Sequence, residues 1–243
     1  MSAIDWAGVQ RRLGRYYPGM VDGVDGPMTW IGLVGFAAPT AAPGGDAVTL
    51  RGRTLAGVNE EFGLITAARI AGYLSNTPHE TGDFGRLRED LYYTTARQIR
   101  RTWPTRFSTD AAAQPYVRNP EALANRVYAR PNEGNTRAGD GWRFRGGGDF
   151  QITFRNGYRR AGTAIGKPLE DHPELIETPA VAVLAALNFW QSNGLNGFYD
   201  RGEPKRARAL ANCGNADAAA PIGWDDVQRR HNRLMTLLTG LGA

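Results

Sequence analysis

The sequence has little of what several classes of protein need. Its 243 residues include one cysteine, Cys213, which excludes an internal disulfide framework and a cysteine-based zinc cluster. The longest apolar runs fall far short of the roughly 20 residues that cross a bilayer, so we expect no stable membrane insertion. The segment "HETGD" at 79–83 begins like the zinc motif H-E-x-x-H, but Asp83 occupies the fifth position and the chain has only three histidines. "RGGG" at 145–148 lacks the Lys-Ser/Thr of a phosphate-binding loop. We therefore expect neither a metal nor another cofactor.

Positive charge, in contrast, is abundant and concentrated. The net charge is +5 with a pI near 9.6, and residues 86–160 contain fifteen arginines and seven acidic residues. This excess is typical of a solvated surface, and it also favours an anionic partner: nucleic acid, a membrane face or a carboxylate-bearing polymer. Charge alone does not choose among them.

Helix signals dominate the chain and predict a mainly α fold. Asn119 with Pro120, and Thr178 with Pro179, have the pattern of a helix N-cap followed by proline at the first helical position. Two apolar stripes support further helices: one through Val58, Phe62, Ile65, Ile70 and Tyr73, and one through Val227, His231, Leu234, Leu238 and Leu241. The best candidate for a short extended piece is "FRGGGDFQITF", so we expect at most a small β element.

The first forty residues are set apart by composition. Residues 37–47, "AAPTAAPGGDA", are rich in Pro, Ala and Gly and predict a linker. About forty residues hardly suffice for a core of their own, so the preceding unit is either docked on the main domain or marginal. We place a small helical module with its linker at residues 1–44 and the main domain at residues 45–243.

Two glutamates stand out as a possible catalytic pair. Glu80 and Glu89 lie in "TPHETGDFGRLREDLYY" at 77–93. On one straight helix their carboxyl groups would be about 13 Å apart and on opposite faces. Gly82 and Gly85 predict that the helix ends just past Glu80 and the chain folds back, which would allow the roughly 6.5–9.5 Å separation of inverting glycosidases. Taken alone, surface carboxylates paired with Arg86 and Arg88 are the simpler interpretation.

Four sequence segments, which occur in a characteristic order, favour the catalytic interpretation instead. "HETGDFGRLREDLYYT", "NPEALANRVYA", "GDGWRFRGGGDFQITFRNGY" and "LANCGN" resemble the family 19 glycoside hydrolases, most of all the lysozyme-like branch found in phage endolysins. The resemblance covers residues 55–240 and implies a lysozyme-like α-helical catalytic domain. The segment "VQRRLGRYYPGMVDGVDGPMTWIGLVGF" similarly resembles a shortened peptidoglycan-binding module.

The resemblance implies roles for individual residues. Glu80 matches the general acid, Glu89 the base that activates water, and Thr153 the hydroxyl residue that holds that water. Without the resemblance, Thr153 is an ordinary strand residue, Gln151 a surface amide and Asn212 a helix C-cap. Aromatic residues near the motifs are candidates for stacking on sugars, although at least half of them are expected in the core. The residues expected to contact substrate are His79, Tyr128, Trp142, Arg145, Gln151 and Asn212.

The sequence also departs from the family pattern. Gly147 stands where the family has a second arginine, and Asp149 stands at a typically apolar or proline position. The Asn-Tyr that commonly follows "QLT" appears as Gly157-Tyr158, and "NGG" appears as "NCG" at 212–214. We expect these changes to fall in the substrate cleft.

The resemblance and the charge together predict an endolysin. The expected reaction is hydrolysis of the β-1,4 bond between N-acetylmuramic acid and N-acetylglucosamine in bacterial peptidoglycan, by a monomer that binds no nucleic acid. The alternatives are a chitinase, a non-catalytic wall-binding protein, a nucleic-acid binder and a lytic transglycosylase. No basic segment followed by an apolar stretch opens the sequence, so we expect the protein to stay in the host cytoplasm until it is released to the periplasm and cell wall.

Overall fold

The computed structural model describes residues 3–42 and 44–241. These residues form α-helices and short 3-10 helices, and no strand is found among them. The mainly helical fold expected from the sequence is therefore confirmed. The helices are α1 (Trp6–Leu13), α2 (Pro27–Ala37), α3 (Asp46–Val58), α4 (Ala67–Thr81), α5 (Ala96–Thr102), α6 (Asp110–Ala113), α7 (Pro120–Val127), α8 (Asp140–Arg143), α9 (Arg155–Ile165), α10 (Pro179–Ser192), α11 (Leu195–Asp200), α12 (Pro204–Cys213) and α13 (Trp224–Thr239). The 3-10 helices are η1 (Gly14–Tyr16), η2 (Gln114–Tyr116), η3 (Pro131–Glu133) and η4 (Pro173–Glu177).

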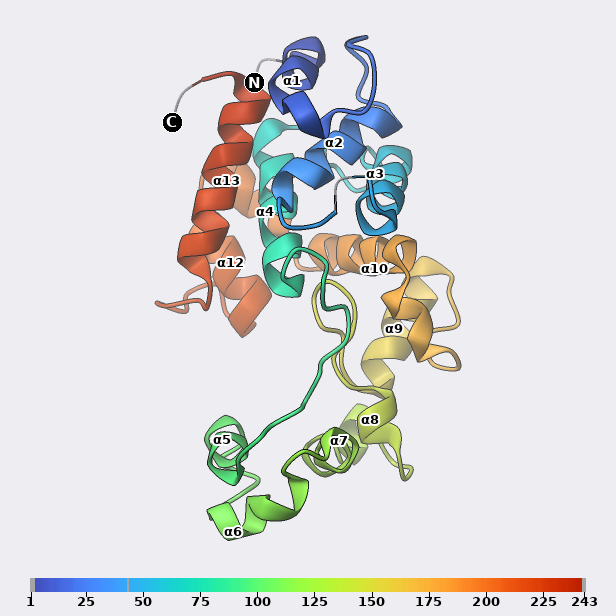
Figure 1. Ribbon diagram of the computed structural model, residues 1–243, viewed down its shortest axis with the longest axis vertical. Coiled ribbons are helices and arrows are strands. Elements are labelled where there is room, and N and C mark those ends of the chain that lie inside the picture. Colours follow the sequence, from blue (N-terminus) through green and yellow to red (C-terminus); the bar gives the residue numbers. More distant parts are fainter. Residues whose placement is uncertain (1–2, 43, 242–243) are drawn as a thin grey trace.

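Most helices pack into one body, which we call the large lobe (α1–α4 and α9–α13; Figure 1). Its main core joins helices that are far apart in the sequence, and Trp30 of α2 and Trp190 of α10 are both fully buried in it. α2 and α3 approach closely because α3 has Gly52 at their contact, where a Cβ atom would lie 2.5 Å from the Ile31 Cα atom. A second cluster around Phe144 and Tyr158 lies between α9, η4 and α10.

Residues 91–143, with α5–α8, form a separate small lobe at the other end of the molecule (Figure 1). This lobe has its own core, in which Ile99, Leu123 and Ala124 are fully buried. Two long connecting segments, residues 82–90 and 144–154, join it to the large lobe (Figure 1). One isolated β-bridge, Arg88 with Gly147, joins the two connectors, and a second, Gly147 with Ile152, lies within the second connector. The small β element expected around "FRGGGDFQITF" is limited to these bridges.

Local signals predicted several helix ends well. Asn119 caps α7, and its side-chain oxygen accepts a hydrogen bond from the Ala122 amide (3.2 Å). Pro179 begins α10, whose N-cap is Thr178. α4 ends at Thr81, one residue after Glu80, because Gly82 adopts a left-handed conformation with φ of 57°. The predicted break between the two glutamates is therefore confirmed.

Two predicted stripes extend too far. The stripe from Val58 to Tyr73 is not one helix, because α3 ends at Val58 and Thr66 caps a new helix, α4. Ile65 lies in the turn between them and is 56% exposed. At the C-terminal end, α13 ends at Thr239, before Gly240 in a left-handed conformation, and leaves Leu241 exposed. Apolar spacing does not mark where one helix stops and another begins.

The N-terminal helices share the core of the large lobe. Val9 and Leu13 of α1 and Trp30 of α2 belong to the same buried cluster as Ile70 of α4 and Trp190 of α10. Of the two expectations for this unit, the structure shows the docked one. The predicted linker begins with two buried residues, Ala37 and Ala38, and leads directly into α3, while Pro43 lies outside the described residues. None of the described helices is long and apolar enough to cross a bilayer.

Candidate active site

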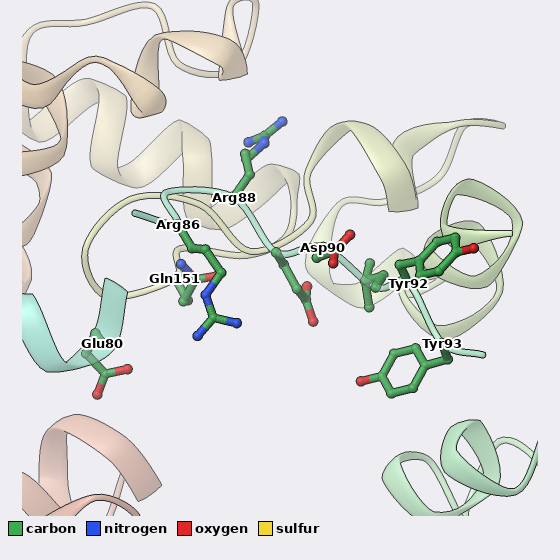
Figure 2. Close-up of a pocket in the computed structure, with 9 residues that line it drawn as sticks. Glu80, Arg86, Arg88, Asp90, Tyr92, Tyr93 and Gln151 are labelled. Carbon is green, nitrogen blue, oxygen red and sulfur yellow. The ribbon is translucent and has the colours of Figure 1, made fainter. Parts of the chain in front are cut away.

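A cleft of about 440 Å³ lies where the two connectors leave the large lobe. Figure 2 shows Glu80 on one side of this cleft and Tyr92 and Tyr93 on the other, with Arg86 and Gln151 between them. Both glutamates singled out in the sequence line the cleft. The full lining is Glu80, Arg86, Arg88, Glu89, Asp90, Leu91, Tyr92, Tyr93 and Gln151.

Glu80 is held from the large lobe. Its Oε1 atom accepts a hydrogen bond from the Arg208 guanidinium of α12. Arg208 is fully buried, and it also donates to the Ile222 carbonyl oxygen at 2.7 and 3.0 Å. Two helices and the 214–223 loop therefore fix the position of Glu80. Among the described residues, Oε2 of Glu80 has no hydrogen-bond partner, and 19% of the side chain is exposed.

Glu89 is held from the small lobe. The Tyr128 hydroxyl at the end of α7 lies 2.8 and 2.7 Å from its two carboxylate oxygens, and the Gly146 amide donates to Oε2 at 3.3 Å. Its backbone is clamped by the Gly146 carbonyl oxygen (2.9 Å) and by Nε of Arg145 (3.1 Å). Burial and the nearby carboxylate raise the pKa of Tyr128 well above its usual range, so its phenol remains a donor.

Gln151 lies beside Glu89 on the second connector. A Cβ atom at Gly146 would lie 2.7 Å from Oε1 of Gln151 and 3.3 Å from Oε2 of Glu89, so a side chain at this position would displace the Gln151 amide. Gln151 has a positive φ of 48°, and its amide nitrogen donates to the Gly148 carbonyl oxygen at 3.0 Å. The structure thus brings together Glu80, Glu89 and Gln151 among the predicted site residues.

Six of the nine predicted site residues lie outside the lining of the cleft, and three of these, Thr153, Asn212 and His79, make hydrogen bonds elsewhere. The Thr153 hydroxyl donates to the Gln151 carbonyl oxygen at 2.9 Å. Asn212 accepts from the Ile222 amide at 3.0 Å and so shapes the loop that holds Arg208. His79 contacts Asp226 of α13 at 2.9 Å. The roles expected for these residues in contacting water or substrate stay predictions.

The other predicted contacts have different neighbours as well. Arg145 places its guanidinium 3.5 Å from the centre of the Trp142 ring, so one face of that ring is covered. Tyr128 packs edge-on against Phe154 and directs its hydroxyl to Glu89. Of the aromatic residues near the motifs, Tyr92 and Tyr93 line the cleft, and Tyr92 is 50% exposed.

Asp149 does not lie in the cleft, where the sequence comparison placed it. It is fully buried and forms a bidentate ion pair with Arg51 of α3 at 2.5 and 2.8 Å. Burial raises the pKa of Asp149, and the Arg51 guanidinium opposes this shift. A carboxylate buried this deeply has to be paired. Through its ion pair with Arg51, Asp149 anchors the second connector to the large lobe.

Gly147 also faces packed atoms. A Cβ atom there would collide with the Tyr158 hydroxyl and lie 2.8 Å from Cγ2 of Ile176. Side chains of α9 and η4 therefore occupy the space next to this position. In the described part of the chain, no group of three or more His, Cys, Asp or Glu side chains is arranged to hold a metal ion.

Sequence reasoning missed Arg208 and the cleft-lining Asp90 and Leu91. Arg208 is 128 residues from Glu80 in the chain, and nothing in "KRARALANC" marks it as the partner of a carboxylate. On the simpler interpretation of the motif, Arg86 and Arg88 would pair with the two glutamates. Arg88 instead pairs with Glu177 at 3.2 Å, and Arg86 reaches into the cleft (Figure 2). The pairing with surface arginines is thus wrong for Arg88.

Two solved structures match the chain with TM-scores below 0.5. Chitinase C from Streptomyces griseus matches 98% of this chain and 78% of its own, with a TM-score of 0.48 and 16% identity. A bacterial family 19 chitinase matches 98% of both chains, with a TM-score of 0.45 and 16% identity. Likeness at this level supports no inference. No protein-family profile matches the chain.

Sequence relatives are more informative. A glycosyl hydrolase family 19 domain-containing protein of Haemophilus influenzae is 32% identical over 133 residues, which are 54% of this chain and 66% of that protein. Acidic endochitinase Q of Nicotiana tabacum is 43% identical over 51 residues, 21% of this chain and 20% of that enzyme. Both matches span less than two thirds of the relative. Over about half of its length, the chain is thus similar to a protein described as having a glycosyl hydrolase family 19 domain.

Proposed function

We propose that the protein hydrolyses β-1,4 bonds of an N-acetylhexosamine polymer by an inverting mechanism. The observation that supports this most is the placement of Glu80 and Glu89 in one cleft, each held by a different lobe. Inverting hydrolysis needs a carboxylic acid on one side of the scissile bond and a carboxylate with space for water on the other. Glu80 and Glu89, which line one cleft from two separate lobes, are the pair that we assign to these roles.

In this proposal Glu80 protonates the leaving oxygen. Arg208 contacts Oε1, so Oε2 is the oxygen available to hold the proton and face the bond. Glu89 takes a proton from water as the water attacks the anomeric carbon. The Tyr128 hydroxyl and the Gly146 amide keep the Glu89 carboxylate oriented for that task. Water adds directly to the sugar, and no covalent intermediate forms.

Replacing the acid tests the proposal. We expect Glu80→Gln to lower hydrolysis of purified polymer by roughly a thousandfold, because the amide cannot supply the proton. The substitution also removes the counter-charge of the buried Arg208, so the unfolding midpoint should fall, and hydrolysis is measured at a temperature at which circular dichroism shows the variant folded. A variant that hydrolyses polymer nearly as well as the wild type would refute the role of Glu80. Sedimentation with cell walls without release of reducing ends from the wild type would instead support a non-catalytic wall-binding protein.

Peptidoglycan is the substrate that we propose first. Its lactyl and peptide carboxylates make the strand anionic, which suits a chain of net charge +5. Chitin is the second candidate, because one relative is an endochitinase. Release of reducing ends from both polymers, measured side by side, separates the two. Mass spectrometry of the muropeptides identifies the bond that is cut, and anhydro-muramic ends would indicate a lytic transglycosylase.

The biological setting follows from that substrate. We propose that the enzyme acts as a phage endolysin, held in the host cytoplasm as a monomer and released to the wall at lysis. Expression in a bacterial host with and without a pore-forming partner tests this role. Lysis that requires both the partner and intact Glu80 supports it, and lysis by the Glu80→Gln variant contradicts it.

A further inference from the structure

A second hollow, of about 400 Å³, lies on the small lobe. It shares no residue with the catalytic cleft. Its walls come from the segment after α5 and from the segment after α7 that includes η3. The lining consists of Arg106, Ala129, Arg130, Pro131, Asn132 and Glu133.

The two arginines of this hollow have no carboxylate partner among the described residues. No ion pair within 4 Å joins Arg106 or Arg130 to any acidic side chain there, although Glu133 lies in the same hollow. Arg130 is positioned by an aromatic ring, because its guanidinium lies 5.5 Å from the centre of the Phe154 ring. The hollow has a net charge of +1 and two guanidinium groups with donors to spare.

The hollow is next, along the chain, to the residue that holds the catalytic base. Ala129 and Arg130 directly follow Tyr128, whose hydroxyl contacts Glu89. Phe154, which supports Arg130, packs edge-on against the ring of Tyr128 with the ring centres 5.5 Å apart. The hollow and the support of the catalytic base therefore share residues 128–130 and the Phe154 ring.

We propose that this hollow binds a carboxylate of the peptide stems of peptidoglycan while the sugars of the same strand occupy the cleft. The inference rests on the proposed function. It explains why the enzyme would prefer peptidoglycan to chitin. Guanidinium groups bind carboxylates with paired, charge-assisted hydrogen bonds. A neutral glycan such as chitin offers no anionic group to Arg106 and Arg130.

The test compares one double variant on two substrates. We expect Arg106→Gln/Arg130→Gln to lower kcat/KM on peptidoglycan roughly tenfold, mainly through KM, because two partly exposed ionic contacts are lost. On a neutral N-acetylglucosamine hexamer the loss should be several times smaller. A matched variant, Arg53→Gln/Arg160→Gln, removes the same charge from exposed positions on two helices of the large lobe and should behave as the wild type.

A chemical change to the substrate gives a second measurement that does not depend on the variant folding. Amidation of the stem carboxylates should reduce wild-type kcat/KM by about as much as the double substitution does, and should add little to the loss in the double variant. Unchanged activity of the wild type on amidated peptidoglycan overturns the inference. Equal losses on both substrates, or an equal loss in the Arg53/Arg160 variant, overturn it too.

Measurements on the wild-type protein distinguish failure of the proposed function from failure of this inference. A wild-type protein that cleaves neither polymer refutes the proposed function and the inference with it. A wild-type protein that cleaves peptidoglycan, together with a double variant that cleaves it equally well, refutes the inference alone.

Discussion

The two lobes use arginine differently. In the large lobe, nine of the fifteen arginines form ion pairs within the described chain, and in the small lobe only Arg100 of nine does. The small lobe has nine arginines and four acidic residues, a charge of +5 that equals the net charge of the whole chain, so the remaining residues sum to zero. Arginines in the large lobe hold its parts together, whereas those in the small lobe remain available to a partner.

The two glutamates of the catalytic pair are also held by different lobes. Glu80 is held by an ion pair with Arg208 of the large lobe, and Glu89 is held by the neutral hydroxyl of Tyr128 in the small lobe. Only the two connectors link these supports in the chain. Changes in either lobe should therefore affect one partner of the pair, and the following predictions order such changes from the largest effect to the smallest.

Breaking the buried ion pair of the large lobe should have the largest effect on stability. Asp149→Asn leaves the Arg51 guanidinium buried without a counter-charge, and we expect a loss of roughly 3 kcal/mol in the free energy of unfolding. Chemical denaturation followed by circular dichroism measures it. Arg51→Met/Asp149→Leu, which removes both charges, should recover most of the loss. An Asp149→Asn protein as stable as the wild type would show that this pair does not hold the connector.

Removing the hydroxyl that orients the base should affect catalysis and leave the fold intact. For Tyr128→Phe we expect a fall in kcat of roughly tenfold with little change in KM, because Glu89 loses a donor to both carboxylate oxygens. Steady-state kinetics on soluble oligomers separate the two parameters. A rise in KM at constant kcat would instead assign Tyr128 to substrate binding, as the sequence suggested.

Acid should weaken the large lobe through Asp226. Burial alone would raise the pKa of Asp226, but hydrogen bonds with His79 and Arg230 lower it to about 2. Because the folded pKa lies below the unfolded value of about 3.9, this stabilisation is complete above that value and is lost as the pH falls toward 2. Thermal unfolding between pH 5 and pH 2 should show a shallower decline for Asp226→Asn. Parallel curves for the two proteins would contradict this.

Exposed arginines should give the smallest effects, and the lobes should still differ. Arg97→Gln/Arg101→Gln in the small lobe should change the free energy of unfolding by less than about 0.5 kcal/mol, because neither residue has a carboxylate partner in the described chain. Arg69→Gln in the large lobe breaks a two-point contact with Asp200 and should cost about 0.5–1 kcal/mol. Equal costs would remove the difference between the lobes.

Local features of the sequence predicted local structure. Asn119 before Pro120 marked the start of α7, and Gly82 marked the end of α4. Both signals work because the backbone conformation depends on the residue itself and its immediate neighbours. The apolar stripe from Val58 to Tyr73 was wrong as a prediction of one helix. Apolar spacing can continue across a turn, and here Thr66 starts a new helix after the turn.

Contacts between distant residues could not be predicted in this way. Arg51 and Asp149 are 98 residues apart, and Arg208 and Glu80 are 128 apart, so no spacing rule connects them. Tyr128 was noticed as an aromatic residue near a motif, but its contact with Glu89 depends on how the small lobe is placed by the connectors. The two carboxylates could be identified from the sequence. The residues that hold each of them became apparent only in the fold.

The central claim is that Glu80 and Glu89 act together across one cleft as acid and base. Proton NMR of the first products from a soluble β-1,4-linked oligomer tests it most directly, because direct attack by water inverts the anomeric centre. The account predicts that the wild type releases the α-anomer first and that Glu89→Gln releases almost none. Initial release of the β-anomer would mean a retaining reaction and would contradict the account.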